Sequence, residues 1–257
     1  MSVIWLGFIG SLIAGALTGV GALGVFFIRR LSEKLEDGLL SFAAGIMLAA
    51  SFFSLLLPGI EYGEKHFEST YIAVGVVIAG VLAGAVVLWG MNQVLPHEHF
   101  RLGHQGPDTE TLSRIWLFII AITIHNFPEG MAVGVGFAGG DVANGTTLAT
   151  GIGIQNIPEG LAVSVSMLAV GYSKAKSFTV GFLTGLAEPI GGLVGSVAVS
   201  FSGPVLPFSL AFAAGAMLFI ISHEIIPETH RSRFANVATF SLLTGFVFMM
   251  FLDTTLG

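Results

Sequence analysis

Two nearly identical polar clusters lie thirty positions apart within long apolar stretches of the chain. The first is HNFPEG at 125–130 and the second is QNIPEG at 155–160. Each cluster places a carboxylate and neutral donor groups in an apolar segment of membrane length, where an ionisable side chain is costly and usually functional. Imidazole, carboxylate and amide groups together suit borderline divalent metals such as zinc. The pair therefore predicts a buried cation site.

The spacing within each cluster directs its polar side chains toward one side of a helix. The six candidate ligands of the clusters are His125, Asn126, Glu129, Gln155, Asn156 and Glu159. The first and last ligands of each cluster are four positions apart and share a helix face, while the asparagine is rotated by about a quarter turn. Two facing glutamates repel each other, and a divalent metal removes that conflict. The chain has no cysteine, which argues against copper(I).

Each cluster also contains a proline beside its ligands. Pro128 and Pro158 have no N–H, so the carbonyls of Ile124 and Ile154 lose their usual donor and the helix is expected to bend. Irregular backbone at membrane depth is tolerated mainly where it lines a cavity. Hydrogen bonding between helices is the alternative explanation for polar groups here. The repetition of the whole motif favours the metal site.

The composition predicts an integral membrane protein. Of 257 residues, 54% are hydrophobic and 10% are charged, and the mean hydropathy is +0.87, whereas soluble domains carry roughly 25% charged residues. Apolar runs of membrane-spanning length predict eight helices, here called spans one to eight. They are Val3–Ile28, Leu39–Leu57, Tyr71–Leu95, Ile115–Ala138, Thr146–Val170, Phe178–Phe201, Leu206–Ile226 and Ala235–Leu252. The predicted fold class is an all-α polytopic membrane protein with a single domain over 1–257.

Positive charge is distributed unequally between the two sides of the predicted membrane domain. Nine of the ten Lys and Arg residues follow odd-numbered spans, and only Lys65 lies on the other side. The positive-inside rule therefore places those loops in the cytoplasm and both termini outside. The one sizeable loop, 96–113, is then cytoplasmic, and its His97, His99 and His104 suggest either a metal-catching segment or disordered chain. No basic stripe or phosphate loop indicates a nucleic acid partner.

An apolar heptapeptide occurs twice, in spans two and seven. FAAGIML at 42–48 and FAAGAML at 212–218 match at six of seven positions, on helices that cross the membrane in opposite directions. The chain thus resembles a 3+2+3 arrangement, in which inverted repeats of three spans flank the central pair with the polar clusters. Inverted repeats place a substrate site near the bilayer midplane and permit alternating access. A selective metal channel using the same ligands is the alternative.

An intramembrane metal-dependent hydrolase is the alternative among enzymes. Its best candidate motif begins at His223 and Glu224, but Pro227 occupies the place of the second histidine that H-E-x-x-H requires. We therefore expect no enzymatic activity.

The two polar clusters resemble the motifs of the ZIP family (Zrt/Irt-like proteins) of divalent-metal transporters, in its prokaryotic branch. The resemblance covers essentially the whole chain. The resemblance implies a homodimer in the lipid bilayer of the bacterial inner membrane. It implies import of zinc, and also of cadmium, manganese or iron, into the cytoplasm. The metal is then the transported substrate, and no cofactor is expected. The family is usually described as moving spans one, four, five and six against a frame of spans two, three, seven and eight.

The resemblance also implies the residues that contact the metal. Carried over by position, the ligands of a binuclear centre bridged by two glutamates are Met47, His125, Asn126, Glu129, Gln155, Asn156, Glu159 and Glu188. Residues similar to the family's entrance and release path are Ser54, Glu61, His223, Glu224 and Asp253. A solvated acidic rim is the alternative for the outer acids, and an interface pair is the alternative for the two residues of span seven.

Overall fold

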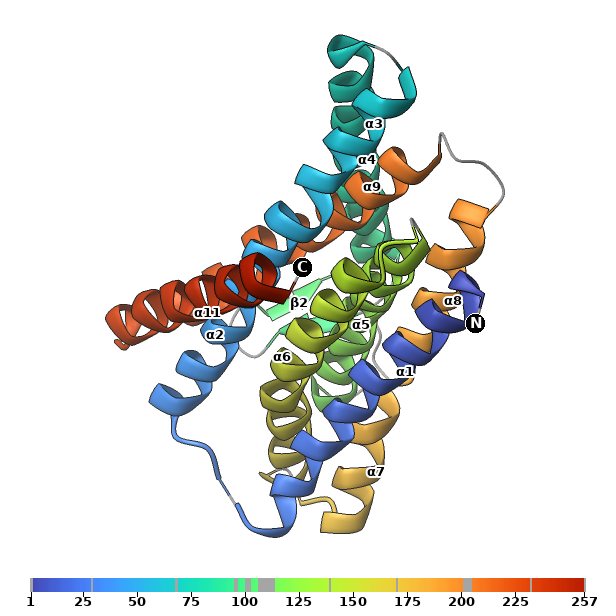
Figure 1. Cartoon of the computed structure of the whole chain (residues 1–257). Coiled ribbons are helices and arrows are strands. Elements are labelled where there is room, and N and C mark those ends of the chain that lie inside the picture. Colours follow the sequence, from blue (N-terminus) through green and yellow to red (C-terminus); the bar gives the residue numbers. More distant parts are fainter. Residues whose placement is uncertain are drawn as a thin grey trace.

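Long helices make up nearly all of the described chain (Figure 1). The computed structural model describes residues 2–28, 30–67, 69–94, 97–99, 103–105, 114–138, 140–169, 171–200, 205–231 and 233–256. The elements in chain order are α1 (Val3–Ala22), the 3-10 helix η1 (Leu23–Phe26), α2 (Glu33–Ala50), the π-helix η2 (Ser51–Leu56), α3 (Leu57–Phe67), α4 (Thr70–Val94), β1 (His97–His99), β2 (Gly103–Gln105), α5 (Arg114–Ala138), α6 (Val142–Ala169), α7 (Lys174–Thr184), α8 (Ala187–Ser200), α9 (Val205–Ile220), the π-helix η3 (Ile221–Ile225), α10 (Ile226–His230) and α11 (Ala235–Leu256).

Six helical segments of the described chain are long and apolar enough to cross a membrane. They are Val3–Phe26, Glu33–Phe67, Thr70–Val94, Lys174–Ser200, Val205–His230 and Ala235–Leu256. These segments correspond to predicted spans one to three and six to eight, so a polytopic all-helical membrane protein is confirmed. The central helices α5 and α6, of 25 and 28 residues, carry the polar clusters.

The second span is longer than its apolar run predicts. The predicted Leu39–Leu57 becomes one helical segment over Glu33–Phe67. At its start the Ser32 hydroxyl accepts a hydrogen bond from the Leu35 N–H at 3.3 Å, which caps the first turn. Farther along, η2 leads directly into α3, and Pro58, just after this junction, does not interrupt the helical segment. A side-chain cap, rather than hydropathy, marks the start of this segment.

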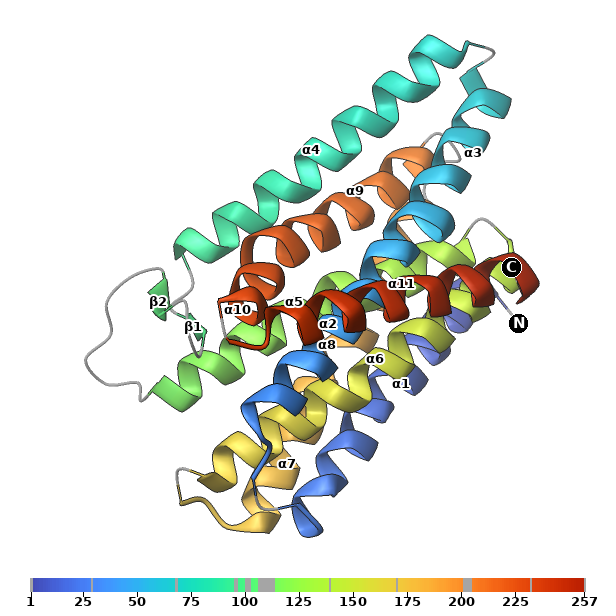
Figure 2. The same cartoon turned by 90° about the vertical axis from the view of Figure 1, so that its left-hand side faces the viewer.

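The helices form two groups according to their most extensive contacts. In the frame group, α2 packs along α11 and α4 packs along α9. In the site group, α1 packs along α6 and α5 packs along α8, with α7 against α1 and α6. Figure 1 shows α11 beside α2 and α1 beside α8, and Figure 2 shows α4 alongside α9. The groups meet mainly where α2 contacts α6 and where α9 contacts α5.

The central helices form a hairpin that brings the two polar clusters side by side. Gly140 adopts a left-handed conformation (φ +80°) at the turn between α5 and α6. The carboxylate of Asp141 then accepts a hydrogen bond from the Asn144 N–H at 3.0 Å and caps α6. Both helices continue through Pro128 and Pro158.

The connection between α4 and α5 contains two short antiparallel strands. β1 and β2 pair with Glu98 opposite His104. The remainder of the predicted 96–113 loop, and the side chains of its three histidines, lie outside the described residues. Metal capture by this loop stays a prediction.

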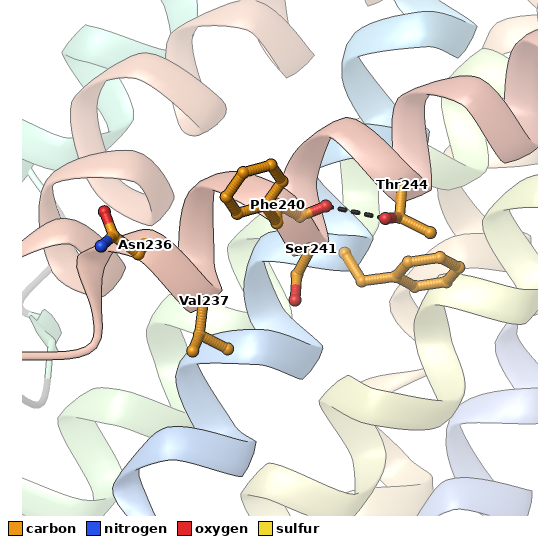
Figure 3. A pocket seen from close by; sticks show the side chains of 6 residues that line it. Asn236, Val237, Phe240, Ser241 and Thr244 are labelled. Carbon is orange, nitrogen blue, oxygen red and sulfur yellow. Dashed lines mark hydrogen bonds between the residues drawn. The ribbon is translucent and has the colours of Figure 1, made fainter.

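A surface pocket of about 400 Å³ lies beside α11 (Figure 3). It is lined by Phe42, Asn236, Val237, Phe240, Ser241 and Thr244. The Thr244 hydroxyl donates to the Phe240 carbonyl at 2.7 Å, so this polar group is satisfied within its own helix. The pocket lies on the frame group and none of the candidate ligands lines it.

Candidate metal centre

The structure buries all eight candidate ligands. Relative exposure is 6% or less for each of Met47, His125, Asn126, Glu129, Gln155, Asn156, Glu159 and Glu188. They come from α2, α5, α6 and α8, which are far apart in the sequence. Ordinary packing accounts for the burial of a methionine, but burying three carboxylates requires compensating partners.

Hydrogen bonds connect the clusters across helix boundaries. The Gln155 amide of α6 donates to Glu129 Oε1 of α5 at 2.7 Å. The Asn156 amide donates to Glu188 Oε1 of α8, also at 2.7 Å. The Glu159 carboxylate lies close enough to interact electrostatically with both other glutamates. The hairpin and α8 thus assemble three carboxylates and two amides in one buried cluster.

Five oxygen atoms of this cluster, and one of Asn126 in the first motif, have no hydrogen-bond partner within the described part of the chain. They are Asn126 Oδ1, Glu129 Oε2, Gln155 Oε1, Asn156 Oδ1, Glu159 Oε2 and Glu188 Oε2. Leaving a buried polar atom unsatisfied costs about 1–3 kcal/mol, and more when the group is charged. Native interiors rarely tolerate such a concentration. The Nδ2 of Asn126 is also unpaired among the described residues, but carboxylate and amide oxygens dominate the set. The cluster therefore has the chemistry of a cation site.

The glycine of each motif allows a neighbouring helix to approach closely. A Cβ at Gly130 would collide with the backbone of Glu188, and a Cβ at Gly160 would collide with the backbone of Thr18. Close backbone approach at small residues is the usual packing mode of membrane helices. Gly130 thereby fixes the distance at which α8 presents its glutamate to the cluster.

In this arrangement the candidate ligands hydrogen-bond to one another. Among the residues that the structure describes, no three His, Asp or Glu side chains converge closely enough to hold a metal ion. The amide nitrogens of Gln155 and Asn156 face the carboxylates, whereas their oxygens are unpaired. Rotation of each amide by half a turn would present its oxygen where its nitrogen now lies. Metal ligation by this set thus requires side-chain rotation, and the backbone arrangement already brings the groups together.

Comparisons with known proteins identify the family of this chain. A model of the family described as ZIP Zinc transporter matches residues 92–253. Similar proteins include the "Zinc transporter ZIPB" of Bordetella bronchiseptica, 45% identical over 242 residues that cover 94% of this chain and 78% of that protein. The chain belongs to the ZIP family. The "Zinc transporter GufA" of Myxococcus xanthus is 43% identical over 98% of this chain and 99% of its own length. The "Zinc transporter ZIP11" of Homo sapiens is 32% identical over 97% of this chain and 96% of its own length.

Membership of the ZIP family makes this chain an integral membrane transport protein. The six apolar segments agree with that assignment. The resemblance inferred from the two polar clusters is confirmed.

The predicted entrance residues of this ZIP-family chain lie together at one end of the frame group. The Ser54 hydroxyl in η2 donates to the Asp253 carboxylate in α11. Asp253, Glu61 and Asp141 line a pocket of about 220 Å³, together with Lys65. Three of the eight residues that line this pocket are acidic, and its role as an entrance stays a prediction.

The two predicted release residues separate in the structure. Glu224 is buried and contacts the imidazole of His125, although the two residues lie 99 positions apart in sequence. His223 is exposed and stacks on Phe219. Sequence reasoning missed Asn92 of α4, whose amide donates to Glu224 at 2.6 Å. A lone asparagine near the end of an apolar span gives no signal of this contact.

Proposed function

We propose that this protein carries zinc across the bacterial inner membrane into the cytoplasm, with the cluster between α5, α6 and α8 as its transport site. The observation that carries the proposal is the set of six unpaired buried oxygens, five on the two polar motifs and one on Glu188 of α8. Two bacterial relatives are named zinc transporters, which supports zinc as the substrate, and their bacterial origin supports the bacterial plasma membrane as the location. We expect cadmium, manganese and iron(II) to compete, because the ligand set contains imidazole and oxygen donors.

The transport site is proposed to be binuclear. One zinc is assigned to Met47, His125, Glu129, Gln155 and Glu159. The second is assigned to Asn126, Asn156 and Glu188, together with the two glutamates of the motifs, which bridge the metals. The unpaired Oε2 atoms of both bridging glutamates support this assignment, since each carboxylate has an oxygen without a hydrogen-bond partner among the described residues that could ligate a metal.

Equivalent contacts in the two halves support a 3+2+3 inverted repeat with α5 and α6 as the central spans. A Cβ at Gly45 would meet the Leu242 carbonyl, and a Cβ at Gly215, in the second heptapeptide, would meet the Val81 carbonyl. Each heptapeptide is followed by a π-helix, η2 or η3. The packing of α2 along α11 in one half corresponds to the packing of α9 along α4 in the other. In the same way, the packing of α1 along α6 corresponds to that of α8 along α5. The loop charges favour both termini outside.

The two helix groups support a carrier. The site group contains the helices of spans one, four, five and six, and the frame group contains those of two, three, seven and eight. We infer that the site group moves against the frame group and exposes the site alternately to the two sides. A channel that uses the same ligands is the alternative mechanism. We also expect a homodimer, which the molar mass of the purified protein in detergent would test.

Zinc uptake by the purified protein in liposomes tests the proposal. A zinc-sensitive dye inside the vesicles should report saturable uptake, and cadmium outside should inhibit it. Zinc preloaded inside should accelerate isotope entry if the protein is a carrier, whereas a channel would show no such acceleration. Absence of protein-dependent zinc entry would refute the proposed function.

A further inference from the structure

Two polar pairs link helices of the frame group at opposite ends of the transport pathway. At one end the Ser54 hydroxyl of η2 donates to Asp253 of α11. At the other, the Asn92 amide of α4 donates to Glu224 Oε1 of η3 at 2.6 Å. Asn92 and Glu224 are 4% and 1% exposed, so their hydrogen bond is shielded from water and lipid.

The pairs occupy equivalent positions in the two repeats. Ser54 lies twelve residues after Phe42, which begins the first heptapeptide, and Glu224 lies twelve residues after Phe212, which begins the second. Both residues are in the π-helix that follows the heptapeptide.

The partners on the adjacent helices are equivalent as well. A Cβ at Gly84 of α4 or at Gly245 of α11 would meet the carbonyl of the phenylalanine that begins the neighbouring heptapeptide. Asn92 follows Gly84 by eight residues, and Asp253 follows Gly245 by eight residues. Because the spacings match on both helices, the internal repeat relates the Asn92–Glu224 pair to the Ser54–Asp253 pair.

The repeat exchanges the acidic member between the two helices of a pair. In the outer pair the acid is on α11 and the hydroxyl is on η2. In the inner pair the acid is on η3 and the neutral donor is on α4. As a result the Glu224 carboxylate reaches the transport site: one oxygen accepts from Asn92, and the other contacts His125 Nε2.

We propose that Asn92 is a positioning residue of the transport pathway, which holds the carboxylate of Glu224 against His125. This proposal rests on the proposed function. A metal that binds His125 must displace Glu224 from the imidazole, and Glu224 is then adjacent to a metal that leaves toward the cytoplasm. The hydrogen bond from Asn92 sets the strength of that competition, because it fixes one carboxylate oxygen and thereby directs the other.

Removing the amide donor should tighten zinc binding and slow zinc release. Asn92→Leu keeps nearly the same shape but has no donor for Glu224. We expect both KM and Vmax for zinc uptake to fall, each by roughly 3- to 10-fold, which is the range expected for the loss of one typical intramolecular hydrogen bond. A general packing defect would lower the amount of active protein without lowering KM.

The experiment measures initial zinc uptake in proteoliposomes over a range of zinc concentrations. It compares the wild type with Asn92→Leu, Glu224→Gln and the double variant, and uses Gln93→Leu as a control at an exposed neighbour on the same helix. We expect a joint fall in KM and Vmax for both single variants, no further loss in the double variant, and wild-type kinetics for the control.

A KM that is unchanged or raised in Asn92→Leu, or independent effects that multiply in the double variant, would overturn the proposal. If Asn92→Leu does not elute as folded protein, Glu224→Gln decides the question, and a KM that does not fall in it overturns the proposal. Absence of zinc uptake by the wild type would instead refute the proposed function.

Discussion

Replacing Glu129 with glutamine separates the transport role of the cluster from its structural role. Glu129 is completely buried and interacts electrostatically with Glu159 and Glu188. Glutamine has the same shape, and its carbonyl oxygen can still accept the hydrogen bond that Gln155 gives to Oε1. In the metal-free protein the substitution replaces one of three neighbouring carboxyl groups, which disfavour one another's ionised forms, with a neutral amide. We therefore expect the metal-free variant to be at least as stable as the wild type.

Zinc affinity should change in the opposite direction. Removing one partner from a buried ion pair costs about 3–5 kcal/mol. Since 1.4 kcal/mol corresponds to a tenfold change in affinity, zinc should bind roughly 100- to 4,000-fold more weakly to Glu129→Gln. The bridging assignment places this residue in contact with both metals, so the loss should be at the upper end of that range.

Two assays on the same preparations measure both effects. Isothermal titration calorimetry of the purified protein gives the zinc affinity, and thermal unfolding in the presence of a chelator gives the stability of the metal-free fold. Glu33→Gln, in the exposed first turn of α2, is the control with the same change of charge. Affinity within threefold of the wild type for Glu129→Gln would refute the bridging role. A large loss of metal-free stability would show that the carboxylate is mainly structural.

Four further outcomes are expected. Gln155→His should raise the ratio of zinc to manganese uptake, because imidazole replaces a harder amide oxygen; an unchanged ratio would argue against this residue as a ligand. Met47→Leu should weaken cadmium binding, whereas Met217→Leu, at the equivalent buried position of the second heptapeptide, should not; equal effects would indicate packing alone. Uptake at subsaturating zinc, with equal pH on both sides, should rise between about pH 5 and 7.5, because protons compete with the metal for imidazole and carboxylate ligands; a flat profile would contradict this. Gly84→Ala should lower the thermal unfolding temperature through overlap with a neighbouring backbone, and Gly90→Ala, which meets only open space, should not; similar temperatures would contradict the close helix contact.

The positions of the helices and the burial of the cluster could be predicted from the sequence because both depend on local pattern. Hydropathy located six confirmed spans, and the four-residue spacing of His125 and Glu129 placed both on one face of a single helix. Helix ends were less predictable, since the first turns of α2, capped by Ser32, and the whole of α3 extend the second span beyond its apolar run.

The partners of the buried side chains could not be predicted from periodicity. A helical repeat indicates which face a residue occupies but not the neighbour that the face meets, because that depends on the rotation and depth of another helix. The contact of His125 with Glu224, and the hydrogen bond from Asn92 behind it, join three helical elements. The short hairpin formed by β1 and β2 was likewise not predicted, because its polar, histidine-containing segment lacks the alternation of a strand.

Locating the bound zinc is the most direct test of the transport site. Crystals of the protein grown with zinc, measured with X-rays at the zinc absorption edge, give an anomalous map that shows the metal alone. We expect strong peaks between α5, α6 and α8, within ligating distance of His125, Glu129 and Glu159. Zinc found only at the outer acidic pocket or in the loop between α4 and α5, with none inside the cluster, would contradict the assignment.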